Sequence, residues 1–234
     1  MKKKLTFILT LLLGGIVMVT LSACSKYNNR EWIENKVSEV SRVYPTENLF
    51  DLFKEFPEGF SILQTSHKTI NNERLRITVF MVGDVNSKTI KGTIKAIKVH
   101  TKPYKEEVKK STEIEYRDGK FAFSDENTAK ELWDYNGFLL QKLTLNKKEL
   151  SKLDLKEKNY NSVTNTFEIY YELDNSVINN YLSTKGEQIM SISGAMSNNN
   201  EKGYRLNVVI SSQMNKADGI GEIISTWEDE KKGR

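Results

Sequence analysis

The sequence predicts an α+β fold, dominated by antiparallel sheet built from hairpins, with a pair of helices at the N-terminus and short helices inserted later. Two observations carry this prediction. Segments with the alternating pattern of strands follow one another across short turns, and segments with helical spacing gather near the N-terminus and at two later insertions. A doubly wound sheet would need regular alternation of strands and helices, so the sequence argues against it.

The helix pair comes first along the chain. Apolar residues recur at helical spacing between residues 30 and 43, and Pro45 ends this helix. Thr46 is placed to cap a second, shorter helix with Leu49 on its apolar face, and Pro57 closes it. We therefore expect two short helices before the first strand.

The middle of the chain has the character of β-strands. Strands are predicted at 61–67, 75–82 and 90–100, separated by turn-rich sequences. The pair Asp118-Gly119 is the strongest hairpin signal, because both positions tolerate the positive φ of a type I′ turn. A helix capped by Ser124 or Asp125 is expected to follow this hairpin and to run through Trp133.

The second half of the chain is predicted to mix short helices with strands. The expected elements are a strand at 138–145, a short helix at 147–153, a strand at 167–173, a helix capped by Asp174 or Asn175 that ends at Leu182, and a hairpin of 188–195 with 204–211. Residues 220–227 are expected to add an edge strand. Whether the strands form one sheet or two stays open at this point.

Composition restricts the classes of function. A chain of 234 residues with 38% hydrophobic content is long enough to bury a substantial core. The single cysteine excludes a disulfide framework and a thiolate zinc site. The formal net charge is +4 at pH 7, and three of the positive charges lie at residues 2–4.

The first 24 residues have the layout of a bacterial lipoprotein signal peptide. A basic segment at 2–4 precedes an uncharged apolar run at 5–21, and the sequence LSAC at 21–24 resembles a lipobox. In a lipobox the small residues fit the signal peptidase, and the cysteine thiol forms a thioether with a diacylglyceryl group. We therefore predict that residues 1–23 are removed and that Cys24 is lipidated. The alternative is an uncleaved membrane anchor, because this stretch is long enough to cross a bilayer.

Cleavage before Cys24 would change the charge balance and fix the location. Residues 1–23 hold three lysines and no acidic residue, so 32 positive and 31 negative charges would remain. A nearly neutral chain gives no support to a nucleic-acid partner. Two acyl chains anchor a protein stably. We expect a lipidated tether at 24–30 and a single, monomeric domain at 31–234 on the extracytoplasmic face of the cell membrane.

The sequence gives little support to catalysis. The chain has only two histidines, His67 and His100, and neither belongs to a recognised nucleophile motif. Two histidines and one cysteine leave zinc with too few ligands, and the segment 84–88 departs from the calcium-loop pattern. Residues 219–222 fall short of a dinucleotide-binding fingerprint. We therefore expect no enzymatic activity, no catalytic residue, no metal and no cofactor.

A local concentration of lysines is the main candidate for binding. Eight lysines and two glutamates lie between residues 88 and 110. A bulge near Ala96-Ile97 would bring five basic side chains to one outward face. These are Lys91, Lys95, Lys98, His100 and Lys102. The hypothesis is that they bind a polyanion outside the cell, such as wall polymer, anionic lipid head groups or host glycan; the alternative is a solvated face that keeps the sheet soluble.

Three segments behind the LSAC sequence carry a resemblance to a known family. They are Ser41 to Phe60, Ser87 to Gly92 and Tyr170 to Leu182. With them the chain resembles the staphylococcal tandem lipoprotein family over most of its expected mature length. The resemblance implies a membrane-anchored surface lipoprotein of α+β fold, without established enzymatic activity and linked with host-cell contact and immune recognition of the lipidated N-terminus. Only Cys24 transfers as a functional residue.

The expected function is that of a surface binding or interaction module. Its expected partners are the lipid bilayer, through acylated Cys24, and a wall polyanion or a host surface component. Two alternatives stay open. A substrate-binding lipoprotein of a transporter would need two α/β lobes around a cleft, and a wall-directed hydrolase would need a pocket that unites His67 or His100 with two carboxylates.

Overall fold

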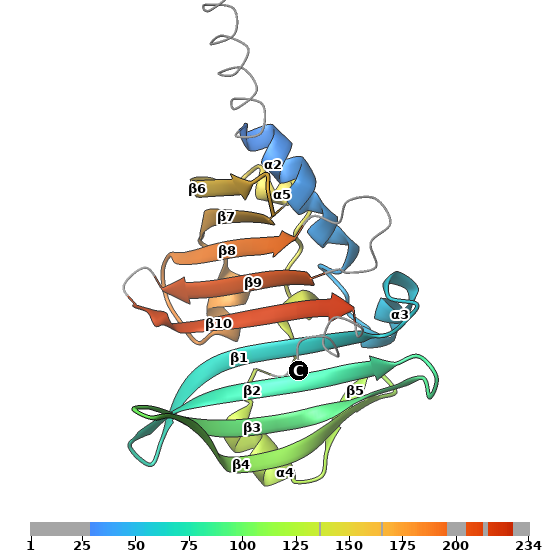
Figure 1. Cartoon of the computed structure of the whole chain (residues 1–234), viewed down its shortest axis with the longest axis vertical. Helices are drawn as coiled ribbons and strands as arrows, with labels where there is room; N and C mark the ends of the chain where they lie inside the picture. Colours follow the sequence, from blue (N-terminus) through green and yellow to red (C-terminus); the bar gives the residue numbers. More distant parts are fainter. Residues whose placement is uncertain (1–28, 136, 165, 196–204, 213–214, 227–234) are drawn as a thin grey trace, which may run out of the picture.

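The computed structural model describes residues 29–135, 137–164, 166–195, 205–212 and 215–226, which build a single antiparallel sheet of ten strands (Figure 1). The strands are β1 (Phe60–Ile70), β2 (Glu73–Asp84), β3 (Thr89–Thr101), β4 (Tyr104–Arg117), β5 (Lys120–Phe123), β6 (Asp154–Asn161), β7 (Thr166–Leu173), β8 (Gln188–Ala195), β9 (Arg205–Ser212) and β10 (Asn215–Thr226). Their order in the sheet is β5-β4-β3-β2-β1-β10-β9-β8-β7-β6. The predicted α+β class with antiparallel sheet is confirmed.

The sheet consists of two meanders that meet at the first and last strands. Strands β1 to β5 follow one another outward on one side, and β10 to β6 do so on the other side. β1 pairs with β10 from Phe60 opposite Thr226 to Thr65 opposite Gly221. The expectation that residues 220–227 form an edge strand was therefore wrong, because β10 lies in the middle of the sheet.

Short helices precede and interrupt the strands. They are α2 (Arg30–Val37), the 3₁₀ helices η1 (Ser38–Arg42) and η2 (Leu49–Asp51), α3 (Leu52–Glu55), α4 (Glu126–Leu132), the 3₁₀ helix η3 (Leu139–Gln141), α5 (Lys147–Leu150) and α6 (Ser176–Tyr181). The predicted N-terminal helix pair is confirmed. Its second member is capped by Asn48, whose side chain accepts from Phe50 N at 3.1 Å, and not by Thr46. The strand expected at 138–145 was wrong, since η3 and loops occupy this segment.

The hairpin between β4 and β5 forms as predicted. Asp118 and Gly119 have φ values of 52° and 75°, as a type I′ turn requires. The following helix, α4, is capped by Asp125, whose side chain accepts from the backbone N–H groups of Asn127 and Thr128 at 3.0 and 3.1 Å.

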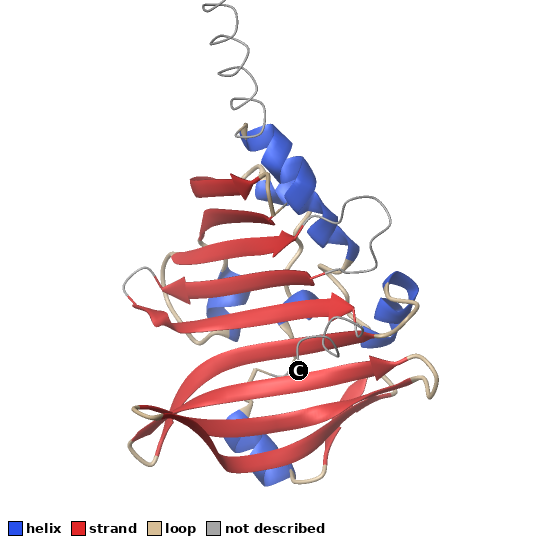
Figure 2. Cartoon of the chain, viewed as in Figure 1, coloured by secondary structure: helices blue, strands red, loops and turns tan. Residues whose placement is uncertain are grey.

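The two faces of the sheet differ. One face, which we call the core face, carries fully buried side chains such as Ile62, Ile77 and Ile94. The opposite face, which we call the open face, carries half-buried side chains such as Leu63 and Thr78. The helices gather on the core face, behind the strands or at their margin in the view of Figure 2. The hydrophobic core therefore lies between this face and the helices.

Candidate functional site

The predicted lipidation site and signal peptide lie outside the described residues, which begin at Asn29. Helix α2 starts at the next residue. No helix in the described ranges is long and apolar enough to cross a membrane.

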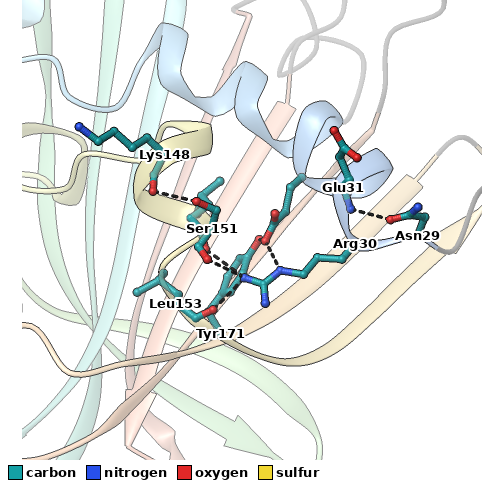
Figure 3. A network of polar contacts seen from close by, with 9 residues as sticks. Asn29, Arg30, Glu31, Lys148, Ser151, Leu153 and Tyr171 are labelled. Atoms are coloured by element: carbon teal, nitrogen blue, oxygen red, sulfur yellow. Dashed lines mark hydrogen bonds and ion pairs between the residues drawn. The ribbon is translucent and has the colours of Figure 1, made fainter.

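The beginning of α2 is fixed to the domain by a polar network (Figure 3). Arg30 Nε donates to Glu34 Oε1 at 2.9 Å, and Arg30 Nη2 donates to the carbonyl oxygens of Ser151 and Leu153 at 3.2 and 2.9 Å. The hydroxyl of Tyr171 on β7 donates to Glu34 Oε1 at 3.1 Å, and burial raises the pKa of this tyrosine. The Glu34 side chain is only 5% exposed. The first turn of α2 is therefore tied to α5 and to β7.

The register of the predicted basic strand shifts where the sequence indicated a bulge. Ala96 pairs with Lys110 and Ile97 pairs with Val108, so the extra residue, Lys109, belongs to β4. The predicted position of the bulge is correct, but the bulged strand is β4 and not β3. Strand β3 therefore keeps regular alternation along its length.

This regular alternation divides the five basic residues between two faces. Lys91 and Lys95 lie on the open face, where Lys95 pairs with Thr78. Lys98 and His100 have the parity of Ala96 and lie on the core face, and Lys102 lies in the turn to β4. The expectation of one continuous basic stripe was wrong, because Ile97 and Val99 occupy the open-face positions that the stripe needed.

Carboxylates accompany most of these basic groups. Three of the five have an acidic partner: Lys91 with Glu115 at 3.5 Å, Lys98 with Glu73 at 2.6 Å and His100 with Glu107 at 3.3 Å. The hydrogen bond from Lys98 lowers the pKa of Glu73. Lys95 and Lys102 make no ion pair with other described residues. Paired exposed charges leave a weaker field for a polyanion than the sequence count implies.

The two histidines lie on opposite faces of the sheet. His67 pairs with Arg76, which in turn pairs with Ile97 on the open face. His100 has the parity of Ala96 and lies on the core face. The described residues contain no group of three or more His, Cys, Asp or Glu side chains that could hold a metal ion. The two histidines therefore do not share a site.

A buried carboxylate at the centre of the sheet was missed by the sequence reasoning. Glu222 on β10 is fully buried. Its Oε1 accepts from Tyr44 Oη and from Leu140 N, both at 2.8 Å, and its Oε2 accepts from Leu139 N at 2.6 Å and from Gln64 Nε2 at 3.0 Å. Burial raises the pKa of Glu222 to about 7, against the opposing effect of the four donors.

The network around Glu222 extends to three further elements. Gln64 Oε1 accepts from Trp133 Nε1 at 2.8 Å, and Gln64 Nε2 also donates to Tyr181 Oη at 3.1 Å. Tyr181 Oη in turn donates to the carbonyl oxygen of Gly137 at 2.8 Å. The network thus joins the end of α4, the segment before η3 and the end of α6 to strands β1 and β10. Because its donors and acceptors are paired with one another, it suits a structural role.

The alternation pattern of β10 indicates that the Glu222 carboxylate is buried. Glu222 has the parity of Ile220 and Ile224, both of which are buried on the core face. An acidic residue in phase with two core residues indicates a buried charge. The residues of the other parity, such as Ile223, are also apolar in part, so the pattern did not show which set faces the core.

Comparison with known proteins adds no relative. No protein-family model matches the chain, and no curated protein matches it significantly. The fold and the sites described above define the chain as an antiparallel α+β domain with one ten-stranded sheet and a buried polar network at its centre. The resemblance to the staphylococcal tandem lipoproteins stays a prediction from the sequence.

Proposed function

We propose that this protein is a lipid-anchored binding module on the extracytoplasmic face of a bacterial membrane, held by acyl groups on Cys24. The observation that carries the proposal is the LSAC sequence behind a basic segment and an uncharged apolar run. The thiol of Cys24 is the only cysteine thiol in the chain, so no other cysteine could take this modification. Host-cell contact and immune recognition of the lipidated N-terminus are the roles that the family resemblance implies.

The arrangement of the first described residues supports this proposal. A tethered domain benefits from a firm connection at the point where the tether ends. Arg30, the last residue of the expected tether, makes hydrogen bonds to Glu34 and to the carbonyl oxygens beyond α5. A pull on the tether would thus act on the α5 segment as well as on α2.

The two alternative functions receive less support. A transporter-type binding lipoprotein is expected to have two α/β lobes, whereas the described residues form one antiparallel sheet. A hydrolase was expected to unite His67 or His100 with two carboxylates, and among the described residues His100 contacts one carboxylate, Glu107. Polyanion binding by Lys91, Lys95, Lys98, His100 and Lys102 stays a prediction, and binding to wall polymer that weakens with salt would support it.

The test of the anchor is the replacement of its cysteine. In a bacterium that processes lipoproteins, Cys24→Ala should abolish both the incorporation of labelled palmitate and the removal of residues 1–23. Ser25→Ala is the matched control and should keep both properties. Acyl labelling that persists in Cys24→Ala would contradict the proposal.

A further inference from the structure

The expected anchor restricts which end of the domain lies beside the membrane. Five residue steps separate Cys24 from Asn29, so the two Cα atoms lie at most about 17 Å apart when the chain is fully extended. The network of Arg30 then holds the first turn of α2 against the residues that follow α5. The surfaces next to the first turn of α2 are therefore the part of the described domain nearest to the bilayer.

The turn between β6 and β7 lies beside this part of α2. The Trp32 ring of α2 packs edge-on against the Tyr160 ring near the end of β6, with 4.8 Å between centroids. Val163 follows three residues later and is 92% exposed, more than any other large apolar side chain in the described part of the chain. The side chain of Asn161 accepts from Val163 N at 2.9 Å and from Thr164 N at 3.2 Å, and so fixes the backbone that presents this valine to solvent.

The charges on this surface are nearly balanced, so charge attraction alone would not hold it to a membrane. Residues 147–158 hold five lysines and three acidic residues. Lys147 pairs with Glu31 at 3.6 Å and Lys152 with Glu149 at 2.8 Å. A nearly balanced surface that carries one fully exposed valine and several long lysine stems suits the boundary between head groups and acyl chains, where apolar groups insert and ammonium groups stay in water.

We propose that residues 161–164 at the end of β6, among them the exposed Val163, and the exposed side of α5 contact the leaflet in which Cys24 is anchored. The domain then stands on its β6 edge, with the long axis of the sheet directed away from the membrane (Figure 1). β4 lies eight strand positions from β6, which corresponds to about 38 Å. This inference rests on the proposed lipid anchor and adds an orientation and a second contact to it.

The experiment compares two exposed valines at opposite ends of the sheet. Val108 on β4 is 53% exposed and is the matched control for Val163. Full-length protein with Val163→Cys or Val108→Cys is labelled with an environment-sensitive fluorophore, which reacts only with the added cysteine when Cys24 is acylated. It is reconstituted into vesicles of phosphatidylcholine and phosphatidylglycerol that contain nitroxide-labelled lipid, and co-sedimentation with the vesicles is measured on the same samples.

We expect a blue-shifted emission for the label at Val163 and quenching at least about twofold stronger than at Val108, because nitroxide acts at short range and Val108 lies about 38 Å away. Equal quenching at both positions in protein that sediments with the vesicles would overturn the inference and leave the anchor intact. Protein that fails to sediment would overturn the proposed anchor, and the inference with it.

Discussion

Glu222 shows what a fully buried carboxylate requires of its surroundings. Removing a carboxylate from water is costly unless hydrogen bonds replace its hydration. Two backbone N–H groups, a tyrosine hydroxyl and a glutamine amide supply these bonds, and all four donors are neutral. Without a cation in contact, the loss of hydration outweighs the donors and raises the pKa of Glu222 to about 7.

The raised pKa of Glu222 predicts a domain that is more stable in mild acid than in mild base. A folded-state pKa of about 7 against a reference value of 4.5 means that the folded protein binds the proton more tightly than the unfolded chain does. The resulting stability is fully present below pH 4.5 and is lost as the pH rises through 7. Between pH 5 and pH 8 we expect the free energy of unfolding to fall by about 2–3 kcal/mol as Glu222 loses its proton.

Urea denaturation at pH 5, 6, 7 and 8 measures this change, with Glu222→Gln as the reference. The amide of glutamine does not titrate, so the difference between the two proteins isolates the contribution of Glu222 from that of all other titrating groups. Glu222→Gln should be less stable at every pH, because its NH₂ group faces donors, but its slope should be flatter. Identical slopes in both proteins would refute the raised pKa.

Strands β2 and β3 approach so closely that one position admits no side chain. A Cβ atom at Gly92 would lie 1.8 Å from the carbonyl oxygen of Phe80 and 2.8 Å from the Cα atom of Met81. We therefore expect Gly92→Ala to force the two strands apart and to lower the free energy of unfolding by about 3 kcal/mol or more, at or beyond the upper end of ordinary overpacking. Thermal denaturation followed by circular dichroism measures the loss.

Gly221→Ala is the control for Gly92→Ala. Gly221 also lies inside the sheet, on β10, but a Cβ there would meet only Val209 Cγ2 at 3.5 Å, an ordinary contact. This variant should keep a melting temperature close to that of the parent protein. Similar losses of stability in both variants would show that replacing any glycine in the sheet is destabilising, and that the close approach of the strands at Gly92 is not the cause.

The elements with local signals could be predicted, whereas those set by long-range pairing could not. Asp118-Gly119 fixes its hairpin through its own backbone preferences, and Asn175 caps α6 with its own side chain. Strand β6 was not predicted, because its sequence DLKEKNYN is charged and has little alternation. The parity of β3 indicates a bulge near Ala96-Ile97 but not which strand holds the extra residue, which lies in its partner, β4.

At the scale of the whole molecule, the two halves of the sheet are joined by contacts between distant parts of the chain. The central pairing of β1 with β10 joins the start of the strand region to its end, and Tyr44 reaches Glu222 across 178 positions of sequence. No local pattern encodes such a pairing. The single sheet and the central polar network therefore became visible only in the structure, although the antiparallel class was predictable from the hairpins.

The attachment of α2 predicts how the whole domain responds when its first contact is removed. Arg30→Met would remove one hydrogen bond from the nearly buried carboxylate of Glu34 and leave it the bond from Tyr171. Losing one partner of a buried pair typically costs about 3–5 kcal/mol, and we expect about 1–2 kcal/mol here because Arg30 is 39% exposed.

Hydrogen exchange should locate the loss of protection caused by Arg30→Met in α2 and α5, while β1 and β2 stay protected. Arg42→Met is the matched control, because Arg42 Nε also lies 2.9 Å from a glutamate oxygen, but its partner Glu55 is 35% exposed and can be hydrated again. Equal destabilisation by the two variants would mean that the burial of Glu34 is not what makes the Arg30 contact strong. A selective loss in α2 and α5 would instead indicate that the segment next to the expected anchor is stabilised as a unit separate from the centre of the sheet.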